Sequence, residues 1–290
     1  MIEFDAPAEV VSGLRDPVVV AAFEGWNDAG DAASAAVDHL VRAWSATPLG
    51  AVDPDEFYDF QVNRPTVSLV DGLARRIEWP TTRLLLASPA GAARDVVLIR
   101  GVEPNMRWRG FCAELLGAVH ELGAGLVVTL GALLADVPHT RPVQVSGTAG
   151  DAATAQRVGL ARSRYEGPTG ILGVFQDAAD RAGVEAVSFW AAVPHYVAQP
   201  PCPKATLALL RRMEDLLDIA VPLGDLPEEA RAWEEHVDAL ASEDSDVAEY
   251  VANLEAREPA GEAGLSEASG DAIALEFERY LRRRGPGTDS

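Results

Sequence analysis

The sequence predicts an α/β protein with a largely parallel sheet and helices on its faces. Strand and helix patterns alternate over the first two-thirds of the chain, which is typical of α/β folds. Apolar runs rich in β-branched residues, expected of strands buried on both sides, occupy residues 17–23, 125–130 and 184–193. Because strands separated by helices need crossover connections, we expect several neighbouring strands to be parallel.

The other early elements follow from capping residues and apolar spacing. A helix capped by Asp28 or Asp31 carries a stripe at 3.6-residue spacing, made of Ala33, Ala36, Val37, Leu40, Val41 and Trp44. Shorter strands are expected at residues 66–70, 83–87 and 95–100. The next helix ends at Gly123 and carries on one face Trp108, Phe111, Leu115, Val119 and Leu122.

The pattern is less regular in the middle of the chain. Residues 142–146 and 170–174 are predicted to be short strands, and residues 176–182 to be helical. Asp151 can cap a helix that runs to Val158. The segment 146–151 contains two glycines and precedes this helix, and its backbone N–H groups are a candidate for holding a phosphate.

The last third of the chain is predicted to be helical. A helix is expected at residues 204–219, and from Leu226 apolar residues recur at a heptad-like spacing broken only at Asp244, which predicts one long helix or two stacked helices. Three units are therefore expected: an α/β core at 1–202, a helical extension at 203–257, and an acidic linker with a terminal helix at 258–290.

Charge and composition exclude several classes of function. The net charge of −21 is uneven, because residues 1–212 contribute −6 and residues 213–278 contribute −18. Such an acidic block does not bind nucleic acid or an anionic membrane. The two cysteines exclude a disulfide framework, and the absence of a signal peptide and of a membrane-spanning stretch predicts a cytoplasmic protein.

Polar residues collect in four loops that follow predicted strands. Ligands of open α/β sheets bind beyond the carboxyl ends of the strands, so these loops are where a site is expected. The catalytic candidates are Glu24, Glu103, His139 and His195. The ligand-binding candidates are Trp26, Asn27, Asp28, Arg107, Asp136, Thr140 and Arg141.

These residue types suit acid–base chemistry on an anionic substrate. The carboxylates and histidines could transfer protons, and the arginines could hold the anion. We expect one cavity at one sheet edge to be lined by Glu24, Asn27, Glu103, Arg107, His139 and His195. Several of the candidates also have a structural alternative: helix capping by Glu24 and Asp28, a Glu103–Arg107 ion pair, and backbone carbonyls as partners of His139 and His195.

No motif predicts a cofactor or a metal. The chain contains no G-x-x-x-x-G-K-[ST], G-x-S-x-G, G-x-G-x-x-G or H-E-x-x-H pattern. A metal site would require Asp136, His139 and His195 to converge, and we predict none.

The loop motifs together resemble the proteasome assembly chaperone 2 family, in particular its actinobacterial branch. The matching stretches occur in order at residues 23–30 (FEGWNDAG), 101–108 (GVEPNMRW), 131–142 (GALLADVPHTRP), 165–170 (YEGPTG) and 188–196 (SFWAAVPHY). The resemblance covers roughly residues 15–220. High alanine, arginine and glycine with a single lysine also fits a GC-rich actinobacterial source.

The resemblance implies a three-layer α/β/α core with a mixed, largely parallel sheet, similar to the nucleoside phosphorylase/hydrolase fold, plus a C-terminal helical extension. Relatives in eukaryotes assist proteasome assembly. We therefore interpret the chain as a homo-oligomeric protein-interaction or assembly module, with a proteasome-related partner implied by the resemblance alone. The alternative is an enzyme whose loop site acts on a small anionic or nucleoside-like ligand.

Overall fold

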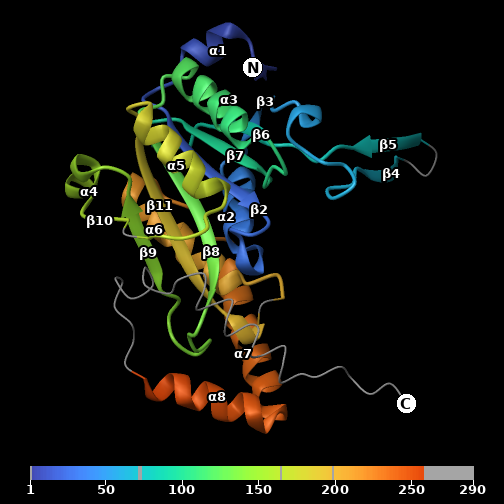
Figure 1. Cartoon of the computed structure of the whole chain (residues 1–290), viewed down its shortest axis with the longest axis vertical. Helices are drawn as coiled ribbons and strands as arrows, with labels where there is room; N and C mark the ends of the chain where they lie inside the picture. Colours follow the sequence, from blue (N-terminus) through green and yellow to red (C-terminus); the bar gives the residue numbers. More distant parts are fainter. Residues whose placement is uncertain (1, 71–73, 164, 198, 258–290) are drawn as a thin grey trace.

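The protein is a three-layer α/β/α sandwich, as predicted, with two helices extending beyond it (Figure 1). The computed structural model describes residues 2–70, 74–163, 165–197 and 199–257. The predicted acidic linker and terminal helix at 258–290 therefore lie outside the described residues. No helix in the described part of the chain is both long and apolar enough to cross a bilayer.

The central sheet has nine strands and mixed direction. Its four middle strands, in the order β7, β2, β8 and β11, are mutually parallel. Antiparallel pairs flank them on both sides, and β10 closes the far edge in parallel with β9. In spatial order the strands are β1 (Glu3–Phe4), β3 (Thr47–Ala51), β6 (Arg83–Ala87), β7 (Val96–Val102), β2 (Val18–Glu24), β8 (Leu126–Ala135), β11 (Glu185–Pro194), β9 (Val145–Ala149) and β10 (Ala161–Arg162).

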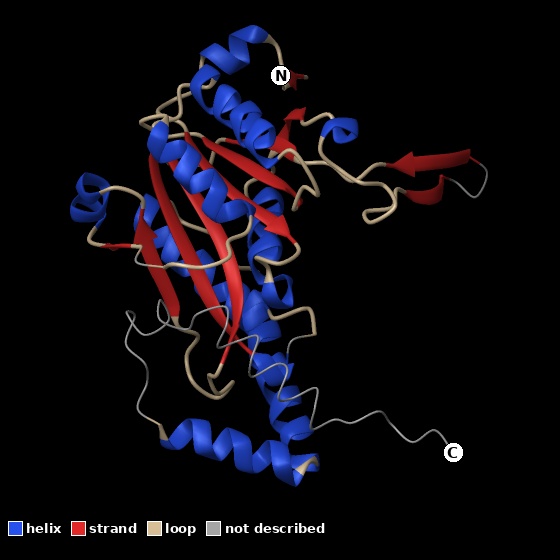
Figure 2. Cartoon of the chain, viewed as in Figure 1, coloured by secondary structure: helices blue, strands red, loops and turns tan. Residues whose placement is uncertain are grey.

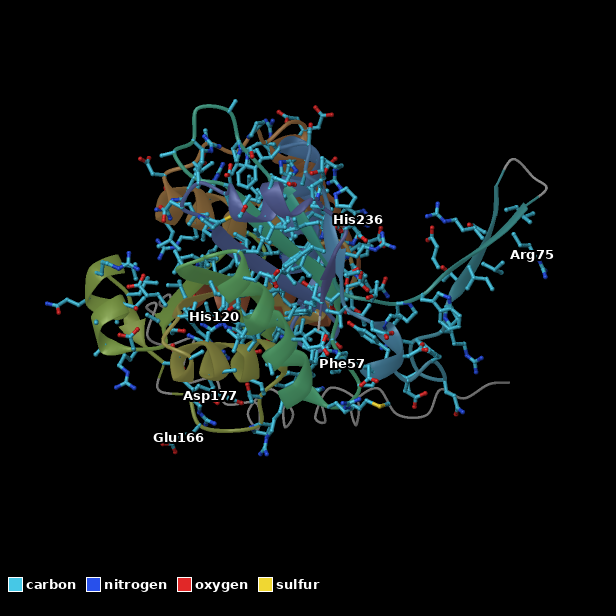
Figure 3. All side chains as sticks on the ribbon, turned by 90° about the horizontal axis from the view of Figure 1, so that it is seen from above. Phe57, Arg75, His120, Glu166, Asp177 and His236 are labelled. Carbon is cyan, nitrogen blue, oxygen red and sulfur yellow. The ribbon has the colours of Figure 1, made fainter. Side chains whose placement is uncertain are left out.

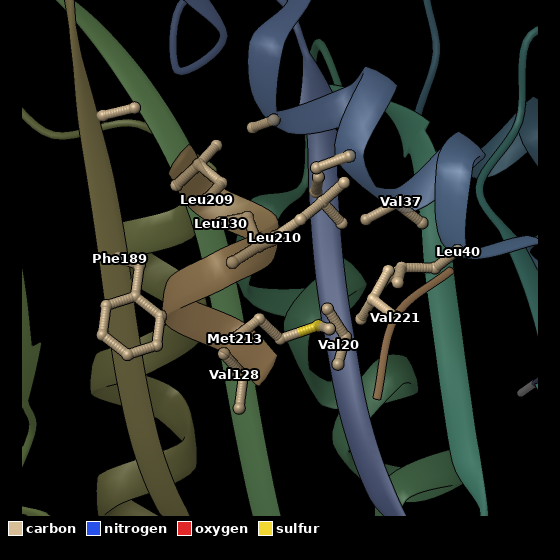
Figure 4. Close-up of a cluster of buried hydrophobic side chains, with 14 of the residues drawn as sticks. Val20, Val37, Leu40, Val128, Leu130, Phe189, Leu209, Leu210, Met213 and Val221 are labelled. Atoms are coloured by element: carbon tan, nitrogen blue, oxygen red, sulfur yellow. The ribbon is translucent and has the colours of Figure 1, made fainter. Parts of the chain in front are cut away.

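Strand β2 shows why the predicted core strands are apolar throughout. Val18, Val20 and Ala22 face one core, with α2 (Ala32–Ala43) and α6 (Pro203–Leu217), whereas Val19 and Phe23 face the other, with α3 (Trp108–Glu121) and α5 (Ile171–Arg181). Successive side chains of a strand alternate between faces, so a strand covered on both sides needs no polar positions. Figure 4 shows the first core, where α6 packs Leu209, Leu210 and Met213 on the sheet.

Two predictions about the middle of the chain are wrong. Of residues 170–174, predicted as a strand, Gly170 precedes the helix α5 and residues 171–174 belong to it; α5 buries positions 171, 172, 175 and 179 at helical spacing. Residues 146–151, the candidate phosphate loop, mostly form the strand β9, which pairs with β11. Asp151 does cap the following helix α4 (Ala152–Val158), as predicted.

The sequence also missed elements near the N-terminus. Strands β1 and β3 and the short helix α1 (Ala8–Ser12) were not predicted. Strand β3 contains Pro48 and Gly50, both unfavourable in strands, and its pairing with β6 is irregular between these residues.

The C-terminal helices divide between the core and the sheet edge. Helix α6 packs on the sheet beside α2, although the predicted core ended at residue 202. Two further helices, α7 (Leu226–Glu243) and α8 (Ser245–Ala256), meet at Asp244, where the apolar repeat breaks. The Asp244 carboxylate accepts hydrogen bonds from the N–H groups of Asp246 and Val247 and so begins α8.

A hairpin of β4 (Thr66–Val70) and β5 (Ala74–Glu78) stands apart from the sandwich as its own two-stranded sheet. Figures 1 and 3 show it projecting to the side, with Arg75 far from the body. We call residues 60–79 the hairpin arm. The arm and its base expose several large apolar side chains, those of Val62, Val67, Leu69, Ile77 and Trp79.

Candidate functional site

The four polar loops lie at the carboxyl edge of the parallel strands. Strands β7, β2, β8 and β11 run in the same direction, so the segments that follow them leave the sheet at one edge. Helices α7 and α8 lie beyond this edge (Figure 2). The contacts of the predicted residues divide them into separate groups.

The carboxylates of Glu24 and Glu103 contact different partners. The Glu103 N–H donates to the Glu24 carbonyl at 2.9 Å, which places the two residues side by side at the ends of β2 and β7. Their side chains have different partners. The Glu24 carboxylate contacts the Arg100 guanidinium at 2.5 Å, and that arginine also contacts Asp38 on α2 at 3.1 Å.

The Glu103 carboxylate joins two segments of the chain. Its Oε1 accepts a hydrogen bond from Asn27 Nδ2 and another from the N–H of Ile171, each at 2.8 Å. Ile171 is the first residue of α5, so Glu103 caps that helix from 68 residues away. Gly170 is needed here, because a Cβ at that position would lie 2.3 Å from the buried Asn27 amide.

Asp28 also serves a helix. Its Oδ1 accepts from the N–H of Ala33 at 2.7 Å and from that of Ser34 at 3.3 Å, in the first turn of α2. Burial raises the pKa of this carboxyl, and the hydrogen bonds oppose the rise. Of the two predicted capping residues, Asp28 therefore performs this role with its side chain.

Two further candidates lie on the outer surface. Trp26 is 63% exposed, so it does not form part of a packed wall. Arg107 pairs with Glu56 and lies 5.7 Å from the centroid of the Phe57 ring. It does not form the predicted ion pair with Glu103.

His139 is buried at the contact between the sheet edge and α7. Its backbone N–H donates to the Tyr196 hydroxyl at 2.8 Å, and its Nδ1 lies 2.7 Å from the same oxygen. Its Nε2 lies 2.9 Å from Asp238 Oδ1 on α7. The Tyr196 hydroxyl can donate a hydrogen bond to Nδ1 while it accepts one from the backbone N–H. All three contacts are satisfied when the ring proton is on Nε2, which then donates a hydrogen bond to Asp238.

His195 belongs to an adjoining cluster that reaches α8. Its Nδ1 lies 3.1 Å from Asp136 Oδ1, in an ion-pair contact too poorly aligned for a regular hydrogen bond. The Tyr250 hydroxyl of α8 donates to the same Asp136 oxygen at 3.1 Å. The contact with His195 is the main reason that the pKa of Asp136 lies below its usual value.

Thr140 and Arg141 complete this contact with α8. The Thr140 hydroxyl donates to Glu255 Oε1 at 2.5 Å, and Arg141 donates to the carbonyls of Glu255 and Arg257. The loop after β8, together with His195 and Tyr196, thus holds the two outer helices. The partners on those helices, Asp238, Tyr250 and Glu255, were not among the predicted site residues.

The structure brings Asp136, His139, Thr140, Arg141 and His195 together, and it brings Asn27 and Glu103 together. It gives Glu24 and Arg107 partners outside both groups. The described part of the chain contains no group of three or more His, Cys, Asp or Glu side chains that could hold a metal ion. Roles for these residues in binding or catalysis stay predictions.

Comparisons with known proteins agree with the fold and the motifs. The model of the PAC2 family matches residues 22–241. A PAC2 family protein of Streptomyces avermitilis is 62% identical, with a TM-score of 0.77 over 81% of this chain and 100% of that one. No match was found among proteins of curated function.

Two other solved structures extend the comparison. A proteasome-assembly chaperone homologue of Mycobacterium tuberculosis is 60% identical, with a TM-score of 0.74 over 81% of this chain and 99% of that one. An archaeal proteasome activator of Pyrococcus furiosus is 16% identical, with a TM-score of 0.66 over 83% of this chain and 98% of that one, and shares the fold.

Proposed function

This chain belongs to the PAC2 family, and from that premise we propose that it works as a protein-interaction or assembly module. The enzymatic alternative gains no support from its relatives. The groups that could have transferred protons are also engaged in other contacts: Glu103 caps a helix, and His139 contacts Asp238.

The observation that carries the proposal is the apolar face of the hairpin arm. Val67 pairs opposite Ile77 in the hairpin register, and Leu69 lies on the same face as Val67. Trp79 follows Ile77 by two residues. These four side chains are 47–64% exposed. Contiguous exposed apolar surface marks interaction sites, and an isolated two-stranded hairpin is marginally stable in water.

The arm also differs in charge from the rest of the protein. Arg64, Arg75 and Arg76 are exposed on it, and residues 60–79 contain two acids, Asp71 and Glu78, so the arm carries a net charge of +1 (3 − 2). The whole chain carries −21. A basic, apolar projection on an acidic protein favours a protein partner with an acidic rim around an apolar patch.

We propose that the partner is a proteasome subunit or assembly intermediate. The support is the 60% identical relative from Mycobacterium tuberculosis, whose description as a proteasome-assembly chaperone homologue applies to that protein. A cytoplasmic location and a homo-oligomeric state belong to the same proposal. Sedimentation velocity of the full chain measures the oligomeric state directly.

The test is capture of purified actinobacterial proteasome subunits by the full-length chain. A variant with V67S, L69S and I77S should capture at least about tenfold less, because each removed side chain contributes of the order of 1 kcal/mol at an interface. The matched control is L240S, which removes a similarly exposed leucine from α7. Equal capture by the arm variant and the control would refute the role of the arm.

A further inference from the structure

A cavity of about 700 Å³ lies between α6, α7 and the segment that enters β9. Helix α6 lines it with positions 204, 207, 208, 211 and 212, and α7 lines it with positions 227, 230, 231 and 234. These spacings of three and four residues place one face of each helix on the cavity. Its volume falls in the range of small-molecule sites. The hairpin arm takes no part in it.

Charge is strongly segregated toward this cavity. All three basic residues of α6 line it, Lys204, Arg211 and Arg212, whereas the two acids of that helix do not. Helix α7 contains one arginine and no lysine, and this arginine, Arg231, lines the cavity. Of the six acidic residues of α7, Glu234 alone lines it. Four cations and one carboxylate therefore surround a cavity in a chain whose net charge is −21.

The one carboxylate of the wall is already used. Glu234 Oε2 lies 2.5 Å from Lys204 Nζ, and that ammonium also donates to the His139 carbonyl. Arg231 pairs with Glu228, but both side chains are largely exposed, so this pair is weak. Within the described residues, Arg211 has no ion pair. The Arg212 guanidinium lies over the Phe189 ring at 5.6 Å from its centroid.

Apart from Gln144, the rest of the wall is apolar. Val143, Val145, Leu207 and Ala208 line the cavity, together with Ala230 from α7. Like charges that face one space repel each other, and an anion placed among them removes that repulsion. Guanidinium groups match carboxylate and phosphate oxygens with paired hydrogen bonds.

We propose that this cavity binds a small organic anion. Arg211 and Arg231 hold its carboxylate or phosphate head, and its apolar body lies against Val143 and Leu207. Because the two arginines come from different helices, the bound anion also ties α7 to α6. This proposal is independent of the function proposed for the hairpin arm.

The test is isothermal titration of the full-length protein with hexanoate, phenyl phosphate and the neutral control hexanamide. Binding of either anion at least about tenfold tighter than hexanamide supports the proposal, and the tighter of the two identifies the head group. The anion affinity should fall as salt is raised, since the groups at the mouth are exposed. Equal or absent binding of all three compounds would overturn it.

Variants locate the site. R211Q and R231Q should each weaken anion binding about tenfold or more, because a hydrogen bond to a charged group contributes about 1.5–3 kcal/mol. Both side chains are exposed, so the fold is kept, which circular dichroism verifies. The matched control is R181Q, which replaces an exposed arginine of α5 on the opposite layer that pairs with Asp177 of its own helix. The site assignment is overturned if R181Q weakens binding as much as the cavity variants.

Discussion

Replacing Glu103 tests whether its carboxylate stabilises the fold, because the hydrogen bonds that it accepts predict how much stability is lost. In E103A, two donors lose a charged acceptor, namely Asn27 Nδ2 and the N–H of Ile171. Hydrogen bonds to charged groups contribute about 1.5–3 kcal/mol each. Asn27 is 1% exposed and Ile171 is 0% exposed, so neither donor readily regains a hydrogen bond to water. We expect the free energy of unfolding to fall by about 3 kcal/mol.

The assay is urea unfolding of the full chain, followed by thermal unfolding. A loss of about 3 kcal/mol corresponds to a thermal midpoint lower by about 5 °C in a chain of this size. E103Q keeps an acceptor oxygen and should lose only about 1 kcal/mol. E121A, an exposed acid at the end of α3, should change stability by less than about 0.5 kcal/mol. The reasoning is refuted if E103A unfolds like E121A, or if E103Q is as unstable as E103A.

Three further changes test other contacts. D238A removes the hydrogen-bond acceptor of the buried His139, so amide hydrogen exchange in α7 and α8 should become about tenfold faster while the core strands stay protected. Unchanged exchange would contradict a role of Asp238 in docking these helices. Because the pKa of Asp136 is lowered in the folded state, its contribution is present above about pH 4 and is lost as the pH falls through the folded pKa. D136N should therefore be less stable than the natural chain at pH 6, and urea unfolding should show this deficit shrinking as the pH is lowered below about 4; a deficit that stays constant would contradict the assignment. G170A should lower the free energy of unfolding by more than about 1 kcal/mol, because the added Cβ would clash with Asn27, whereas G117A in α3, with open space around it, should raise it by about 0.5–1 kcal/mol. Effects of the same sign in chemical unfolding would contradict this steric explanation.

The sequence predicts an element well when its own residues determine its environment. Strands β2, β8 and β11 are buried on both faces, and their apolar runs indicate this directly. Helix α2 is likewise specified by its stripe and by the nearby Asp28. The break between α7 and α8 falls at Asp244, where the repeat of apolar residues already fails.

Helix α5 shows where local pattern is insufficient. Its first turn contains Ile171, Leu172 and Val174, a short apolar run that suits a strand or a helix equally. The helix begins at Ile171 because Glu103 supplies the acceptor for its first N–H. That carboxylate is distant in sequence, so no window around α5 contains the deciding information.

The candidate site shows the same limit at the level of side chains. The sequence correctly places polar residues at the carboxyl edge, because strand ends and their loops can be predicted. It does not reveal their partners, since Asp238 lies 99 residues after His139 and Tyr250 lies 114 after Asp136. Whether a histidine in such a loop faces a solvent cavity or an outer helix depends on how the extension packs.

This packing explains in part why the helical extension is acidic. Asp238, Glu234 and Glu255 meet His139, Lys204 and Thr140, respectively, so part of the negative block faces donors at the sheet edge. These donors hold the acidic helix pair at the edge, so removing the acids should weaken its docking. The arginines around the cavity of α6 and α7 differ from these docking donors. Among them, Arg211 forms no ion pair within the described residues, and Arg231 has only an exposed pair with Glu228, so these two are available to an anion from outside the chain.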